Sequence, residues 1–154
     1  MKRKRIFWLV TILGIIFDQT TKYIVVREFE TINNTYPLWE GIFHFTYVIN
    51  TGAAFSVFSG QVEVLRWVSL IVSLLLIIFV WYIPRLNFLE QLGYGFILAG
   101  AIGNGIDRFL FGYVVDFLDF RLIDFPVFNL ADVAINIGVL LLLITSFTTP
   151  KNNE

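Results

Sequence analysis

The chain has 154 residues, of which 57% are hydrophobic and only 15% are charged, and its net charge at pH 7 is -1. A soluble domain usually carries about 25% charged residues, and a chain this short cannot hide so much apolar surface from water. We therefore expect one membrane domain over 1–154, and we exclude a soluble enzyme and a nucleic-acid-binding module. The chain has no Cys and one His, so its chemistry must depend on carboxylates, amides and a few cations.

Four windows are long and apolar enough for a membrane-spanning helix, which needs roughly 20 mostly apolar residues. The first also resembles the hydrophobic part of a signal peptide, but no small-residue cleavage site follows it and the apolar pattern continues past Lys22. We expect it to be a retained helix. The sequence therefore predicts an all-α membrane protein with four transmembrane helices, at about 6–26, 65–83, 92–111 and 126–147.

The Lys and Arg residues are unevenly distributed around these spans. Lys2, Arg3, Lys4 and Arg5 precede the first span, Arg85 lies between the second and third, and Lys151 follows the fourth. All six fall on one side if the N-terminus is cytoplasmic, as the positive-inside rule favours. We expect both termini in the cytoplasm and the connections at about 27–64 and 112–125 outside.

The outer segment at about 27–64 contains a run rich in strand-forming residues. Phe43, Phe45, Tyr47 and Ile49 alternate with other residues and share one face by the strand period of two. We expect a small extracytoplasmic β element there, lying over the bundle or on the membrane surface.

Polar residues inside the spans are costly, because a charged side chain near the bilayer centre costs about 2.5–3.5 kcal/mol. Asp18 and Lys22 are four apart on the first span and can form an ion pair, which either eases insertion or supports catalysis. On the third span, an Asp107–Arg108 pair alone could be structural, whereas Asn104 on the same stripe as Gly100 is harder to explain in that way.

Two aspartates are brought together by the predicted topology. Asp116 leaves the third span on the outer side, and Asp132 enters the fourth span from that side. Two carboxyl groups in one poorly solvated site share a proton, as in aspartic proteases, where one activates water and the other polarises the scissile carbonyl. Asn129, Asp132 and Asn136 share one face of the fourth span. Asn129 could also be simply the N-cap of that helix, with Asp132 at its third position.

Two other functions fit a small membrane protein. A proton or ion transporter also uses membrane carboxylates, but the spans show no inverted repeat and the acids gather at one interface. A non-catalytic scaffold, with a glycine-rich third span that binds partner helices, gives no reason for Asp116, Asp132 and the asparagines.

Four motifs occur in the order and on the topology of a known family. The sequence resembles lipoprotein signal peptidase, the type II signal peptidase of bacteria, over nearly the whole chain. The elements that carry the resemblance are D-x-x-x-K at Asp18–Lys22, N-x-G-A-A-F-S at Asn50–Ser56, G-N-x-x-D-R followed by G-x-V-x-D-F at 103–117, and F-N-x-A-D at Phe128–Asp132.

The resemblance implies an aspartic intramembrane peptidase that removes signal peptides from prolipoproteins, cleaving before a Cys that carries diacylglycerol. It implies that Asp116 and Asp132 are catalytic, with no metal or cofactor. We expect a monomer in the bacterial cytoplasmic membrane, with the site near the outer face. Asp119 and Asp124 also lie near Asp116, so that assignment depends on the V-V-D-F match. Ala99 stands where the family more often has Gly. The site-lining residues would be Asn50, Gly52, Asn104, Arg108, Asn129 and Asn136, supported by Asp18, Lys22 and Asp107.

Overall fold

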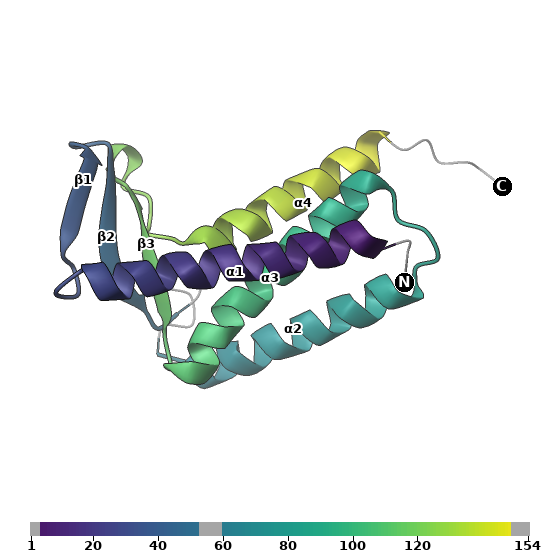
Figure 1. Cartoon of the computed structure of the whole chain (residues 1–154), viewed down its shortest axis with the longest axis horizontal. Helices are drawn as coiled ribbons and strands as arrows, with labels where there is room; N and C mark the ends of the chain where they lie inside the picture. Colours follow the sequence, from purple (N-terminus) through teal and green to yellow (C-terminus); the bar gives the residue numbers. More distant parts are fainter. Residues whose placement is uncertain (1–3, 53–59, 149–154) are drawn as a thin grey trace.

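The computed structural model describes residues 4–52 and 60–148. Four helices form a bundle with a small sheet at one end, and the beginning of α1 and the end of α4 both lie at the other end (Figure 1). The protein is thus mostly helical, as predicted, with a β element. The helices are α1 (Arg5–Glu28), α2 (Val62–Tyr82), α3 (Phe88–Leu110) and α4 (Leu130–Thr148).

Three of these helices, α1, α2 and α4, are long and apolar enough to cross a membrane. The expected third span corresponds to α3, which does not reach that level of hydropathy. Its glycines and the polar residues Asn104, Asp107 and Arg108 lower the average. The expected fourth span begins too early: α4 starts at Leu130, because the residues before it are extended and Phe128 pairs with Leu118 of the sheet.

The sheet contains three antiparallel strands in the order β1 (Thr35–Trp39), β2 (Phe43–Asn50) and β3 (Val114–Phe120), and the 3₁₀ turn η3 (Arg121–Ile123) follows it. β2 is the strand that the sequence predicts. β1 and β3 were not predicted, and β3 matters most because it carries Asp116 opposite Val48. Val25 of α1 packs with Val115 and Phe117, which attaches the sheet to the C-terminal end of that helix.

Helix α3 is the centre of the bundle and packs against each of the other three helices. Close approach needs small residues, and a side chain at Gly100 would overlap the carbonyl oxygen of Ala131 and the side chain of Ile135 on α4. Ala99 is almost fully buried, and its methyl group faces Gly14 of α1. The glycine at position 14 therefore leaves room for the methyl group that Ala99 adds.

We predict that Gly100→Ala separates α3 from α4 and destabilises the fold by about 1–3 kcal/mol, the usual cost of overpacking. Gly105→Ala is the matched control on the same helix, because among the described residues its new methyl group would meet only the Ser69 side chain, at 3.3 Å. Thermal unfolding in detergent micelles should show a clear loss for the first variant and little change for the second. Equal melting temperatures would contradict this account of α3.

Candidate active site

A lysine ammonium is buried between α1 and α3. Lys22 Nζ lies 2.9 Å from Asp18 Oδ2 on its own helix and 2.9 Å from Asp107 Oδ2 on α3. It also donates to Asn104 Oδ1 at 3.0 Å. All four side chains are less than one-tenth exposed. An ammonium has three donors, and here all three are used. The predicted Asp18–Lys22 ion pair is present, and Asp107 adds a second carboxylate across the helix interface.

The same two carboxylates also hold the elements that carry the other aspartates. Asp18 Oδ1 accepts from the backbone N–H of Ala131 at 2.9 Å, at the beginning of α4. Asp107 Oδ2 accepts from the backbone N–H of Val115 at 3.1 Å, next to Asp116 in β3. Gln19, which was not predicted to be part of the site, donates to Asp107 Oδ1 at 2.9 Å. Its position beside Asp18 in the first motif was the only signal available.

The beginning of α4 has the reciprocal geometry of a capping box. Asn129 Oδ1 accepts from the Asp132 backbone N–H at 3.0 Å, and Asp132 Oδ2 accepts from the Asn129 backbone N–H at 3.2 Å. The N-cap interpretation of Asn129 is therefore correct. Each side chain still has a second polar atom, and both of those atoms face the site.

Two asparagine amides connect Asp116 with Asp132. Asn104 Nδ2 donates to Asp132 Oδ1 at 2.9 Å, and Asn104 Oδ1 accepts from Asn129 Nδ2 at 3.0 Å. Asn129 Nδ2 also lies 2.6 Å from Asp116 Oδ1. The two aspartates, which come from different elements, are thus linked through a continuous chain of hydrogen bonds.

Asp116 is the more deeply buried of the two carboxyl groups, with 1% of its surface exposed, whereas Asp132 is half-buried. Burial, together with the nearby charge of Asp132, raises the pKa of Asp116 to about 7. Two hydrogen bonds act to lower this pKa. Asn50 Nδ2 donates to Asp116 Oδ2 at 2.8 Å, and Asn129 also donates to Asp116. The carboxyl of Asp116 therefore holds its proton up to near-neutral pH.

Arg108 lies on α3 beside this pair. Its guanidinium donates to the Gly52 carbonyl at 3.1 Å and to Ser69 Oγ of α2 at 3.2 Å. Gly52 is held in turn, because its N–H donates to Asn50 Oδ1 at 2.8 Å. The arginine therefore joins α2 and α3 to the end of β2. Ser69 was not predicted to be part of this site.

Asn136 departs from the expected arrangement. It is exposed, and its Nδ2 donates to the backbone carbonyl of Asp132 at 3.0 Å. Within the described residues, no hydrogen bond joins it to either aspartate side chain. The rest of the predicted N-x-G-A-A-F-S motif, from Ala53 to Ser56, lies outside the described residues.

The neighbouring acid Asp119 belongs to a separate cluster on the sheet. It accepts from Thr46 Oγ1 at 2.6 Å and from Arg121 Nε at 2.8 Å. Burial acts to raise the pKa of Asp119, but these hydrogen bonds and the arginine charge outweigh it and lower the pKa. Asp119 is thus already an ionised partner of Arg121.

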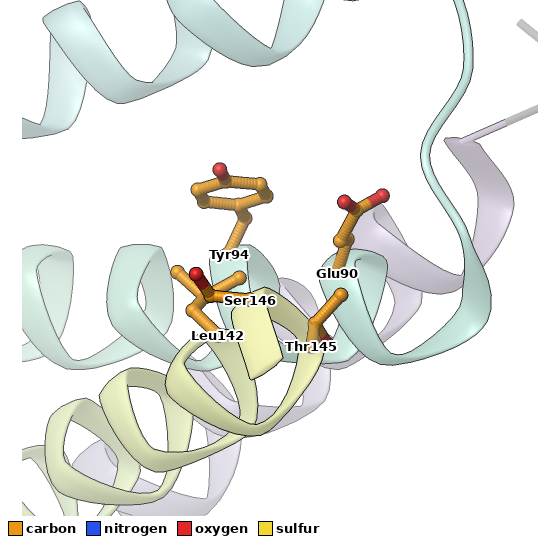
Figure 2. A pocket seen from close by; sticks show the side chains of 5 residues that line it. All are labelled: Glu90, Tyr94, Leu142, Thr145 and Ser146. Atoms are coloured by element: carbon orange, nitrogen blue, oxygen red, sulfur yellow. The ribbon is translucent and has the colours of Figure 1, made fainter. Parts of the chain in front are cut away.

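One hollow among the described residues lies between α3 and α4. Figure 2 shows Tyr94 and Glu90 of α3 standing beside Leu142, Thr145 and Ser146 of α4, around a pocket of about 270 Å³. Thr145 is about 20 Å from Asp132 along α4, at a rise of about 1.5 Å per residue. Over residues 4–52 and 60–148, no three His, Asp or Glu side chains are grouped to hold a metal ion.

Comparison with known proteins identifies the family of this chain. A family model described as signal peptidase (SPase) II matches residues 10–148. The chain belongs to the signal peptidase II family. It is therefore related to membrane peptidases, and the resemblance seen in the motifs is confirmed.

Relatives in the signal peptidase II family match over almost their full length. A lipoprotein signal peptidase of Gloeothece citriformis is 68% identical over 154 residues, which are 100% of this chain and 96% of that protein. One of Synechocystis is 61% identical over 147 residues, covering 96% of this chain and 91% of that protein. A bacterial membrane enzyme whose structure was determined at 2.3 Å resolution is 34% identical, with a TM-score of 0.86, covering 95% of this chain and 90% of that one.

For this member of the signal peptidase II family, we predict that Asp107→Ala costs about 3–5 kcal/mol, the usual effect of removing one partner of a buried ion pair. Loss of the Asp107 carboxylate leaves the Lys22 ammonium with one carboxylate partner and leaves the Val115 N–H without its acceptor. Glu28→Gln is the control, because the Glu28–Arg27 pair is exposed and such pairs contribute about 0–1 kcal/mol. Thermal unfolding in micelles distinguishes the two, and similar melting temperatures would rule out a structural role for the buried pair.

Proposed function

We propose that this chain is a membrane-embedded aspartic endopeptidase that removes signal peptides from bacterial prolipoproteins. The name lipoprotein signal peptidase, carried by a relative of 68% identity, supports the substrate class. The observation that carries the mechanism is the hydrogen-bonded link between Asp116 and Asp132 through Asn104 and Asn129. Cleavage falls before a Cys that carries diacylglycerol.

The two aspartates have different environments and therefore take different roles. Asp132 sits in the first turn of α4, where the helix dipole and the Asn129 N–H stabilise a negative charge. Asp116 is almost fully buried and keeps its proton more readily. Asp132 is the base that activates water, and Asp116 is the acid that donates to the scissile carbonyl oxygen.

The reaction needs only these two groups and a water molecule. The water oxygen attacks the peptide carbonyl carbon while Asp132 takes a proton from the water and Asp116 gives its proton to the carbonyl oxygen. The resulting gem-diol collapses when the C–N bond breaks. Asp132 then protonates the leaving nitrogen, and a hydroxyl proton of the diol returns to Asp116. The dyad ends in its starting protonation state.

The remaining site residues hold this dyad or the substrate backbone. Asn50 and Asn129 donate to Asp116, Asn104 donates to Asp132, and Arg108 holds Gly52 at the edge of the site. Asn136 lines the approach to Asp132 from the exposed face of α4. Asp18, Lys22 and Asp107 support these residues. Among the described residues, this chain itself supplies hydrogen bonds to both aspartates, and we propose a monomer with a single domain over 1–154.

We infer that all four helices span the cytoplasmic membrane, with both termini in the cytoplasm and the dyad near the outer face. Helix α3 carries the polar stripe, and the three apolar helices packed around it shield that stripe from lipid. Lys4 and Arg85 lie at the end of the bundle opposite the sheet, which is the end that the positive-inside rule assigns to the cytoplasm. A substrate signal helix then enters from the bilayer, with its acyl chains in lipid.

We predict that Asp116→Asn and Asp132→Asn each abolish cleavage of a diacylglyceryl-modified prolipoprotein by the purified protein. Each amide removes the carboxyl group that must gain or lose a proton. Asp124→Asn is the matched control, because Asp124 lies outside the site in a left-handed conformation that Asn also tolerates. A substrate without diacylglycerol should remain uncleaved by the wild type. Near-normal turnover by either dyad variant would falsify the assignment.

We predict that cleavage declines as the pH rises through about 7, because Asp116 loses its proton there and can no longer donate to the carbonyl oxygen. The Asn50 hydrogen bond favours the ionised form of Asp116 and lowers its pKa. Removing this bond in Asn50→Ala should therefore move the declining limb to higher pH, whatever happens to the maximal rate. The measurement is kcat/KM against pH for both proteins, and a shift to lower pH would contradict the assigned acid.

A further inference from the structure

The two amides that serve the dyad depend on their orientation. The oxygen and nitrogen ends of an Asn side chain are nearly equal in size, so only the hydrogen-bond partners decide which end faces which group. Asn104 must present its NH₂ to Asp132, because an ionised carboxylate accepts hydrogen bonds and cannot donate one. If the Asn104 amide were turned the other way, its oxygen would face the Asp132 carboxylate and repel it.

Lys22 is the partner that decides this orientation. Its ammonium can only donate, and it lies 3.0 Å from Asn104 Oδ1. A reversed Asn104 would place its NH₂ against the ammonium, with two donors facing each other. Asp18 and Asp107 hold the ammonium in place, each at 2.9 Å, and Lys22 is only 3% exposed.

The Lys22–Asn104 hydrogen bond also affects Asp116, through Asn129. Asn104 Oδ1 also accepts from Asn129 Nδ2, and this NH₂ group donates to Asp116 Oδ1 as well. With the oxygen of Asn104 fixed by Lys22, Asn129 keeps its donor toward Asp116. One ammonium thus sets the direction of the hydrogen bonds received by both carboxyl groups, although it touches neither.

We propose that Lys22 is a positioning residue for the catalytic step, which acts by locking the amide orientation of Asn104. This inference rests on the proposed function, because it assigns Asp116 and Asp132 as the reacting groups. It attributes to the ion pair on α1 a role in the rate of the reaction, in addition to holding helices together. Lys22 is almost fully buried against Asn104, so its loss should change kcat and leave KM nearly unaltered.

The test is a double-mutant cycle on Lys22→Met and Asn104→Ala, with kcat and KM measured on a diacylglyceryl-modified prolipoprotein. Methionine keeps the length of the side chain and removes the ammonium. We expect Lys22→Met to lower kcat by about tenfold to a hundredfold, as removal of an outer partner does at metal sites. In the Asn104→Ala background, Lys22→Met should lower kcat by less than about twofold, because the amide through which Lys22 acts is already absent.

A second readout is the pH profile. The positive charge of Lys22 favours the ionised form of Asp116, so its removal should also move the declining limb of kcat/KM to higher pH. Thr11→Val is the matched control, because Thr11 is a buried polar residue of α1 that bonds to α3 at Gly95 and has no connection to the dyad. It should leave kcat and the pH profile unchanged.

Misfolding is separated from positioning by a variant that keeps the net charge of the buried cluster unchanged. Asp18→Asn with Lys22→Met removes one negative and one positive charge together, and it should show the same loss of kcat with a normal elution profile in detergent. If the losses of Lys22→Met and Asn104→Ala multiply while both dyad variants are inactive, this inference is wrong and the proposed function stands. If a dyad variant stays active, the proposed function itself fails.

Discussion

A buried lysine ammonium in the middle of an apolar bundle must be neutralised, and the arrangement that neutralises Lys22 determines where the other elements lie. Asp18 and Asp107 provide the counter-charges from two helices. These two carboxylates also accept hydrogen bonds from the backbone N–H groups of Ala131 and Val115. Helices α1, α3 and α4 and strand β3 thus meet at one ion cluster, and the two aspartates of the proposed dyad each lie one residue beyond these anchoring N–H groups.

The small residues of α3 allow the helices to pack closely, and this close packing is also needed for the ion cluster to form. A side chain at Gly103 would collide with the Asp18 carboxylate, and one at Gly100 would collide with the first turn of α4. Both helices can therefore approach α3 closely enough for hydrogen bonds of about 3 Å to form across the interfaces. Ala99 fits because α1 has a glycine, Gly14, at the facing position. Ala99, where the family more often has Gly, is thus accommodated by packing against Gly14. This contact lies about one helical turn from the polar cluster.

The helices, the ion pair at spacing four and the N-cap of α4 could be predicted because each depends on residues close in sequence. The strand β3 could not, since its pairing with β2 joins Asp116 to Val48, far apart in the chain. Nor could the partner of Asp107 be predicted. Its chain neighbour Arg108 points about 100° away around the helix and binds the Gly52 carbonyl, so Asp107 pairs with α1. Asn136 shows the limit of periodicity, because it shares a face with Asp132 and yet bonds only to the backbone there.

The Asn129–Asp132 segment caps α4 and also belongs to the proposed active site, because each side chain divides its atoms between these two roles. Asn129 Oδ1 and Asp132 Oδ2 complete the capping box, while Asn129 Nδ2 and Asp132 Oδ1 bond to the amide of Asn104. The start of α4 is therefore held by the same groups that orient the proposed base. Truncating either residue removes a cap worth about 0.5–2 kcal/mol together with a contact of the site. Only substitutions that keep the shape of the side chain, such as Asp to Asn, can separate stability from chemistry here.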